Sequence, residues 1–364
     1  MVVDGLTPGR VARPSTAEQV AEALREAAGD GRSVVPVGGG RALGLGDPPE
    51  RFDVALETRA LDRVLELSQA DMTVSVEAGI TLEALNATLA QVGQFLPIDP
   101  FNAPGHTVGG VLAAGLSGPL RLRYGSPRDF VIGLRVALPD GRLVSSGGRV
   151  VKNVSGYDLN KLHQGALGSL GVIVAASFKV FPRPLHEVTL EARPDDPWRE
   201  AARALALPQP PVALELTSDG YLLGRLAGTA DGVGRLAREL GWTATARDAW
   251  DEHGRRSGGT WARISVPPVR LRGVVDGLPA DARWWASPGV GVAHWTGDLN
   301  AEAVRAARAD SERAGGSLVL LAAPVELKRA VGAWGTPPPT APWMTRIRDA
   351  FDPKRTLSPG RYVV

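Results

Sequence analysis

The stretch that decides the fold is VKNVSGYDLNKLHQGALGSLGVI, residues 151–173. Its glycines at 165, 168 and 171 recur every third residue just before an apolar run, a pattern typical of a turn that leads into a buried strand. The stretch contains neither GxGxxG nor GxxxxGK[ST], the spacings that place a phosphate at a helix N-terminus. If this lysine-containing turn serves a phosphate ligand, it does so without either standard phosphate loop.

A second glycine-rich segment, VGGGRALGLG at 37–46, directly follows the short apolar run 33–37. A strand that runs into three glycines exposes consecutive backbone N–H groups, which bind phosphate oxygens well. Leu43 stands where a dinucleotide fingerprint needs glycine, and the glycines and prolines at 44–49 prevent a helix. The segment therefore predicts either a phosphate-binding turn between strands or a flexible loop.

A third segment, APGHTVGGVLAAGLSGPLRLRYGSPRDF at 103–130, is rich in glycine and alanine. Such residues let a large planar ligand approach the backbone closely. Arg121, Arg123 and Arg128 supply positive charge nearby, or else form an ordinary solvated face. Each of the three segments is a weak signal alone, but together they favour a nucleotide cofactor.

The composition restricts the possible functions. A chain of 364 residues favours two domains, and 44% hydrophobic with 22% charged residues is ordinary for a soluble protein. A formal net charge of +2 without charge runs gives no support for nucleic acid as a partner. The absence of cysteine excludes disulfides, thiolate catalysis and cysteine-ligated iron–sulfur clusters. No apolar run of membrane-spanning length and no signal peptide is recognisable, so we expect a cytoplasmic protein.

The first half of the chain predicts a mixed α+β fold. Helices are expected at 14–29, capped by Ser15 with Glu18, and at 81–93, capped by Thr81. Strands are expected at 33–37, 53–58, 61–68 and 73–79, a hairpin at 130–148, and a long strand at 171–182. Most neighbouring strands are expected to pair through short turns.

The second half repeats one order of elements. All nine tryptophans lie beyond residue 180, after the proline-containing break at 181–187. From 186 and again from 260 the pattern predicts βαββαβ, the ferredoxin-like arrangement. We therefore predict one domain at 1–183, a duplicated cap domain at 184–324 and a C-terminal segment at 325–364 that packs back on the first domain.

The glycine-rich segments, together with the terminal FDPKRTLSPGR, resemble the vanillyl-alcohol-oxidase-type (PCMH-type) FAD-binding family. VVKNVSGYDL and GALGSLGVI are similar to its glycolate- and lactate-oxidising branch, and the modest length resembles an FAD-binding subunit within that branch. The resemblance implies an FAD-binding domain of two α+β subdomains with FAD between them. The implied cofactor-binding residues are Gly38, Gly39, Gly40, Arg41, Ala42, Pro104, Gly105, His106, Thr107, Gly109, Gly110, Ser117, Gly118, Lys152, Gly156, Tyr157, Asp158, Gly168, Gly171, Val172 and Ile173.

The resemblance also implies a chemistry, an oxidoreductase acting on the CH–OH group of a small 2-hydroxy acid. Some members attach FAD through a histidine in the 38–42 turn, where this chain has Arg41, so we expect noncovalent FAD. His106 and His294 are candidates for the base that accepts the hydroxyl proton, and Arg225 and Arg263 for the cations that bind the carboxylate. Exposed strand arginines and a structural histidine are the alternatives, so no catalytic residue is assigned.

Two departures from the family pattern stand out. Longer catalytic relatives carry a paired-histidine metal site, whereas among the five histidines here only His294 falls near the expected region. We therefore expect no metal site. The terminal motif has Ser358 where the family usually has asparagine.

Three functions remain open from the sequence. The first is a subunit of a glycolate-oxidising complex with a longer FAD-containing paralogue and a separate iron–sulfur subunit, attached peripherally to the inner membrane through these partners. The second is a stand-alone FAD-dependent 2-hydroxy-acid dehydrogenase. The third is a scaffold subunit without working flavin. The KNVSGYDL stretch points away from a UDP-sugar-reducing flavoenzyme, which shares only the PGxxGG turn.

Overall fold

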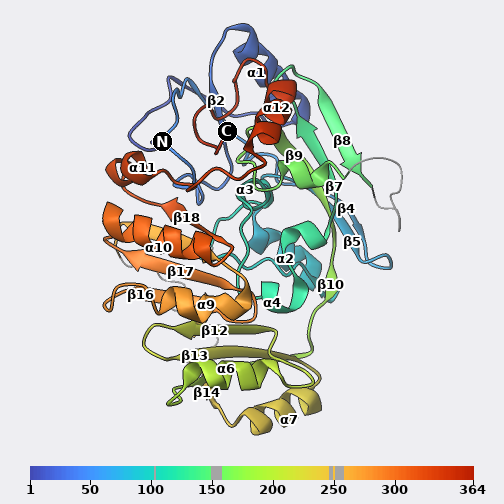
Figure 1. The fold of residues 1–364 in the computed structure, drawn as a ribbon. Coiled ribbons are helices and arrows are strands. Elements are labelled where there is room, and N and C mark those ends of the chain that lie inside the picture. Colours follow the sequence, from blue (N-terminus) through green and yellow to red (C-terminus); the bar gives the residue numbers. More distant parts are fainter. Residues whose placement is uncertain (102–103, 149–157, 246–248, 251–257) are drawn as a thin grey trace.

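The computed structural model describes residues 1–101, 104–148, 158–245, 249–250 and 258–364 (Figure 1). The chain first forms a three-stranded sheet in the order β1-β3-β2, from β1 (Arg10–Ala12), β2 (Val34–Val37) and β3 (Val54–Glu57). Both pairings are parallel, which corrects the expectation that the early strands pair through short turns. The helix α1 (Ala17–Gly29) connects β1 to β2, the two outer strands, which both run parallel to β3.

A five-stranded antiparallel sheet follows, in the order β4-β5-β9-β7-β8. Its strands are β4 (Val64–Ser68), β5 (Thr73–Glu77), β7 (Val131–Ala137), β8 (Leu143–Gly147) and β9 (Val172–Lys179). The predicted hairpin is confirmed as β7 and β8. The strand after the opening glycine turn, β9, occupies the centre of the sheet, where it pairs with both β5 and β7. This position explains why its sequence is almost continuously apolar.

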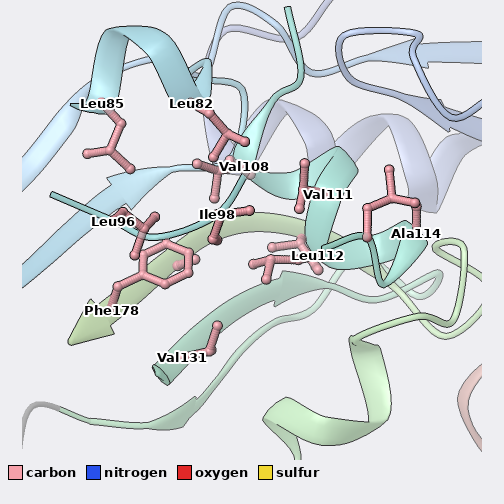
Figure 2. Packing of buried hydrophobic residues seen from close by; sticks show 14 of the residues in the cluster. Leu82, Leu85, Leu96, Ile98, Val108, Val111, Leu112, Ala114, Val131 and Phe178 are labelled. Carbon is pink, nitrogen blue, oxygen red and sulfur yellow. The ribbon is translucent and has the colours of Figure 1, made fainter. Parts of the chain in front are cut away.

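Two helices close the core of this sheet, α2 (Leu82–Ala90) and α3 (Val108–Ala114). Figure 2 shows Val108, Val111 and Leu112 of α3 directed into the same apolar cluster as Leu85 and Phe178. The glycine- and alanine-rich sequence did not predict α3, because those residues weaken the helical pattern that a search relies on. Tertiary packing of its few large side chains stabilises the helix. The short helices α4 (Arg121–Tyr124) and α5 (Asn160–His163) complete this region.

The second half forms one eight-stranded sheet in the order β14-β11-β13-β12-β16-β17-β15-β18. The first unit contains β11 (His186–Ala192), α6 (Pro197–Leu205), β12 (Ala213–Thr217), β13 (Leu222–Gly228), α7 (Ala230–Leu240) and β14 (Thr243–Thr245). The second contains β15 (Thr260–Ser265), α9 (Pro268–Val275), β16 (Arg283–Ser287), β17 (Val292–Gly297), α10 (Ala301–Arg313) and β18 (Ser317–Ala322). The duplicated βαββαβ order is therefore confirmed, and β12 and β16 join the two units edge to edge.

The C-terminal segment returns to the first half of the chain. After α11 (Val325–Val331) and α12 (Ala341–Phe351), residues 356–358 lie beside β2, where Val34 N–H donates to Thr356 O and Ser358 N–H donates to Val34 O. In Figure 1 the red α12 lies next to the blue α1, and Lys354 Nζ donates to the last turn of α1 at Ala28 O. The helix α12 was not predicted, although proline is compatible with its first turn.

Three boundaries differ from expectation. The helix α1 is capped by Thr16, whose hydroxyl accepts from Gln19 N–H, and not by Ser15. The helix α2 ends at Ala90, before Gly93. The small β6 (Gln94–Phe95) pairs with β10 (Phe181–Pro182) at the proline-containing break. No helix of the described residues is long and apolar enough to cross a bilayer. The domain boundaries at 183 and 324 stay a prediction.

Candidate functional site

A cleft of about 720 Å³, partly open to solvent, lies where the glycine-rich segments meet. Twelve of the expected residues line it: Gly38, Gly39, Gly40, Arg41, Ala42, His106, Thr107, Gly109, Gly110, Gly168, Val172 and Ile173. Three segments that are far apart in the sequence therefore contribute to one wall.

The first two loops of the cleft touch through their backbones. A Cβ atom on Gly39 would lie 1.9 Å from Gly105 O, and one on Gly38 would lie 2.2 Å from Thr107 Oγ1. Thr107 Oγ1 accepts a hydrogen bond from Gly39 N–H at 3.2 Å and caps α3 by accepting from Gly110 N–H. The glycines at 38 and 39 are therefore required by packing between the loops, which brings their backbone to the edge of the cleft.

Two arginines line the cleft beside this glycine-rich backbone. Arg41 lines the cleft, and its Nε donates to Pro104 O at 2.8 Å, which joins the two loops a second time. Arg361, from the far end of the chain, lines the same cleft. Backbone turns with two guanidinium groups and little side-chain bulk suit a ligand that carries phosphates.

His106 is the buried titratable group of this cleft. It is 4% exposed, and its Nε2 lies 3.4 Å from the carbonyl oxygen of Phe101. Burial is the main cause that lowers the pKa of His106 below its ordinary value, with Arg41 adding to the effect. The imidazole is therefore neutral at pH 7. Because a carbonyl can only accept, the proton is on Nε2 and the lone pair on Nδ1.

Some expected residues lie elsewhere. Pro104 and Gly105 contact the cleft residues from behind. Gly118 and Gly171 are structural, because a Cβ on Gly118 would collide with Asp99 O and one on Gly171 with Val136. Asp158 is exposed and pairs with Lys161. Lys152, Gly156 and Tyr157 lie outside the described residues.

Ser117 lines a second, smaller pocket of about 370 Å³. Phe101, Leu116 and Arg121 contribute from the first half of the chain, and Trp261, Arg263, Val292, His294 and Leu321 from the eight-stranded sheet. Phe101 connects this pocket with the cleft: its carbonyl faces His106, and its ring packs edge-on against His294 at 5.2 Å. Ligands in the two spaces would therefore be neighbours.

His294 is held rigidly in the second pocket. Trp261 Nε1–H donates to His294 Nδ1 at 3.0 Å, and the ring of Trp285 stacks on the imidazole at 5.2 Å. Because Nδ1 accepts this hydrogen bond, the proton of the neutral imidazole is on Nε2. His294 lies within β17 and lines this pocket, and both of its expected roles, structural histidine and candidate base, stay predictions.

Arg263 has the most unusual environment in the second pocket. Its Nε is buried without a hydrogen-bond partner, and no carboxylate of the described residues pairs with it. Burial first, and then the charge of Arg121, lower the pKa of Arg263. By contrast, Arg225 is paired with Glu187 at 3.2 Å and lies over Trp250. The surroundings of the two arginines therefore differ: Arg225 has an ion-pair partner, and Arg263 has none among the described residues.

The comparisons with known proteins now decide the family. A family model described as "FAD binding domain" matches residues 8–147. Glycolate oxidase subunit GlcE of Escherichia coli is 30% identical over 354 residues, which cover 93% of this chain and 95% of that protein. The chain belongs to this FAD-binding family. It is an FAD-dependent oxidoreductase, and the glycine-rich cradle formed by the backbone of the cleft, with Arg41 and Arg361 beside it, fits FAD as its cofactor.

Other members of the FAD-binding family match over a shorter range. Glycolate oxidase subunit GlcD of Bacillus subtilis is 33% identical over 51% of this chain and 39% of that protein. The mitochondrial cytochrome-type D-lactate dehydrogenase of Arabidopsis thaliana is 36% identical over 50% of this chain and 32% of that protein. Alkyldihydroxyacetonephosphate synthase shares the fold, with a TM-score of 0.69 over 96% of this chain and 75% of that chain at 18% identity.

A titratable group between the two halves of the chain gives a first prediction. Asp99 lines a third cavity, where Leu120 N–H donates to its carboxylate. Burial raises the pKa of Asp99 to about 7, although the charge of Arg225 lowers this pKa. The ordinary pKa is about 3.9. Between about pH 4 and pH 7 the native state therefore binds more protons than the unfolded state, and the free energy of unfolding falls as the pH rises, by at most about 4 kcal/mol.

The measurement is urea denaturation of the wild type and of Asp99→Asn from pH 4 to 8. We expect the decline attributable to Asp99 to disappear in the variant, because asparagine stays neutral and still offers an oxygen to Leu120 N–H. An unchanged pH slope in Asp99→Asn would contradict this account. The other charged groups that act on Asp99 include Arg225, which lowers its pKa, so Arg225→Gln should extend the decline to a higher pH.

Proposed function

We propose that this chain is the FAD-binding (E) subunit of a glycolate oxidase, in which it oxidises a small 2-hydroxy acid such as glycolate to the corresponding 2-oxo acid. The observation that carries the proposal is the unpaired Arg263 in a small pocket beside the cofactor cleft. The similarity to the GlcE subunit, which extends over almost the whole of both chains, supports the same assignment.

The second pocket suits a short carboxylic acid. Arg263 lies at its wall and Arg121 at its exposed edge, so a carboxylate entering from solvent would meet two guanidinium groups. The charge of a carboxylate offsets the cost of burying Arg263. Trp261, Phe101 and Leu321 limit the remaining space to a small substituent on the hydroxyl-bearing carbon.

Oxidation of the alcohol removes a proton from the hydroxyl oxygen and a hydride from the carbon that bears this oxygen. FAD, when bound, supplies the hydride acceptor. Of the two candidate histidines, His106 suits the proton acceptor better, because its Nδ1 lone pair is not used by the Phe101 contact and its low pKa keeps it neutral. His294 carries its proton on Nε2, because its Nδ1 accepts from Trp261. In this tautomer it suits the role of a hydrogen-bond donor to a substrate oxygen.

A second prediction concerns the pH profile. Because burial lowers the pKa of His106, the base is unprotonated down to a pH below 6.5, and kcat/KM with glycolate should decline only below that value. His106→Gln should lose at least about 100-fold in kcat/KM and the acidic limb of the profile. His294→Gln, which offers an N–H at a similar position, should keep the limb. A limb that survives in His106→Gln would exclude His106 as the base.

The partners follow from what the chain cannot supply. With no cysteine, it cannot ligate an iron–sulfur cluster through thiolates. We propose that electrons leave through a separate iron–sulfur subunit and that a longer FAD-containing paralogue completes the complex. FAD is proposed to be noncovalent, because the 38–42 turn presents Arg41 and no histidine.

The test is the visible absorption spectrum of the purified chain before and after anaerobic addition of glycolate. In the complex with its partners, we expect the oxidised flavin bands to bleach. Bleaching by the isolated chain would select a stand-alone dehydrogenase. Flavin that stays oxidised in the complete complex would exclude this chain as the site of glycolate oxidation, and a chain that binds no FAD would be a scaffold.

A further inference from the structure

The end of the chain reaches both sides of the cofactor cleft. Ser358 and Arg361 are 0% and 4% exposed. The Ser358 hydroxyl donates to Leu167 O at 3.2 Å, and Arg361 Nη2 donates to Leu43 O and Leu45 O at 2.6 and 2.5 Å. Leu43, Leu167 and Arg361 all line the cleft. Residues 356–361, which we call the C-terminal clasp, therefore join the loop at 38–46 to the loop at 165–168.

The clasp is fixed from behind as well. The carbonyl oxygen of Arg361 accepts from Trp334 Nε1–H at 2.9 Å and from Asp47 N–H at 3.1 Å. Gly46 has a φ of +94°, and a Cβ there would lie 2.5 Å from the same oxygen. The position of the Arg361 backbone thus depends on a glycine of the first loop, and the side chain then runs forward into the cleft.

The charge of Arg361 is not balanced by the protein. No ion pair of Arg361 with a carboxylate occurs among the described residues, and its Nε is buried without a hydrogen-bond partner. Asp4, whose charge acts on Arg361, is engaged by Lys328 Nζ at 2.7 and 2.8 Å. A buried cation whose hydrogen bonds end only on carbonyl oxygens is costly unless a ligand brings negative charge.

FAD brings such a charge in its pyrophosphate. We propose that Arg361 is a cofactor-binding residue and that docking of the C-terminal clasp and binding of FAD are thermodynamically coupled. The coupling works in both directions: the clasp orders the 38–46 loop for FAD, and FAD stabilises the docked clasp. Ser358 belongs to the same clasp and has a φ of +45°. This left-handed conformation is one that asparagine, the usual residue of the family at this position, tolerates well.

The experiment measures the Kd of FAD for the full chain by quenching of flavin fluorescence. Arg361→Gln should weaken FAD binding by about 10- to 100-fold, because it removes a buried charge from the cleft. Arg361→Lys should recover most of the affinity, because it keeps the charge. The matched control is Arg355→Gln on the same segment, since Arg355 pairs with Asp349 at 2.7 Å away from the cleft and should leave the Kd unchanged.

Hydrogen exchange tests the coupling without substrate. In the wild type, FAD should slow amide exchange across residues 356–361, and this protection should be lost in Arg361→Gln. Equal Kd values for wild type and Arg361→Gln, an Arg361→Lys variant as weak as Arg361→Gln, or clasp exchange that does not respond to FAD would each overturn the proposal. None of these outcomes bears on the hydroxy-acid assignment, because neither measurement involves turnover.

Discussion

Gly39→Ala is expected to raise the Kd of FAD by at least about 100-fold. A Cβ at this position would lie 1.9 Å from Gly105 O, which is backbone and cannot rotate away as a side chain would. The loops at 38–42 and 104–110 must therefore separate, which breaks the Gly39 N–H bond to Thr107 Oγ1 and distorts the cleft on both sides. The whole cost falls on the cofactor site, because these loops lie at its edge.

The control for this prediction is Gly29→Ala at the end of α1. A Cβ on Gly29 meets nothing within 4 Å, and alanine favours a helix, so FAD affinity should stay as in the wild type. Circular dichroism checks that both variants keep their secondary structure. Stoichiometric FAD in folded Gly39→Ala, with a Kd within threefold of the wild type, would refute the cradle as described.

Arg263→Gln is expected to lower kcat/KM for glycolate by about 100- to 1000-fold while FAD binding is unchanged. The guanidinium is a buried cation of the second pocket without an ion pair to a described carboxylate, and glutamine removes the charge that would face the substrate carboxylate. Because Arg263 does not line the cofactor cleft, the oxidised flavin spectrum should remain that of the wild type. Arg263 contributes mainly to binding, so much of the loss should be in KM.

Arg283→Gln is the matched control, an exposed arginine on the neighbouring region of the same sheet that lines neither pocket. A further readout needs no turnover: an unreactive short carboxylate should perturb the flavin spectrum of the wild type but not of Arg263→Gln. The assay uses the complete complex if the isolated chain does not turn over. A loss below threefold in Arg263→Gln would remove Arg263 from the substrate site.

The site was predictable from the sequence where function depends on the backbone. Gly38, Gly39 and Gly168 stand in segments whose glycine spacing marks a turn, and the structure brings all three to one cleft. Gly109 lines the same cleft, but from helix α3 and not from a turn. Such positions leave a strong trace, because only glycine meets the close contacts at 38 and 39. Gly118 and Gly171 show the limit of the same reasoning, since a glycine needed for packing looks identical in the sequence.

A side chain that contacts residues far away in the sequence leaves no local sequence pattern. Arg361 lies more than 300 residues from the carbonyls it contacts, so no local pattern could assign it to the cleft. Its place in the terminal FDPKRTLSPGR motif was the available signal, and that motif indicated only a packed tail. The helix α3 was missed for a related reason, because its stability comes from the core contacts of Val111 and Leu112 and not from helix propensity.

The sequence by itself determined most strands, the duplicated βαββαβ order and the glycine-rich turns at 38–46 and 165–171, because these depend on local periodicity and on conformations that few residues adopt. Only the tertiary structure showed how the surroundings of the two candidate arginines and of the two candidate histidines differ. Arg225 meets Glu187 across β11 and β13, whereas Arg263 meets no carboxylate of the described residues, and Trp261 fixes the tautomer of His294. Whether an arginine has an ion-pair partner, and which nitrogen of a histidine accepts a hydrogen bond, depends on the residues that lie beside it. Folding brings these residues together from distant parts of the sequence.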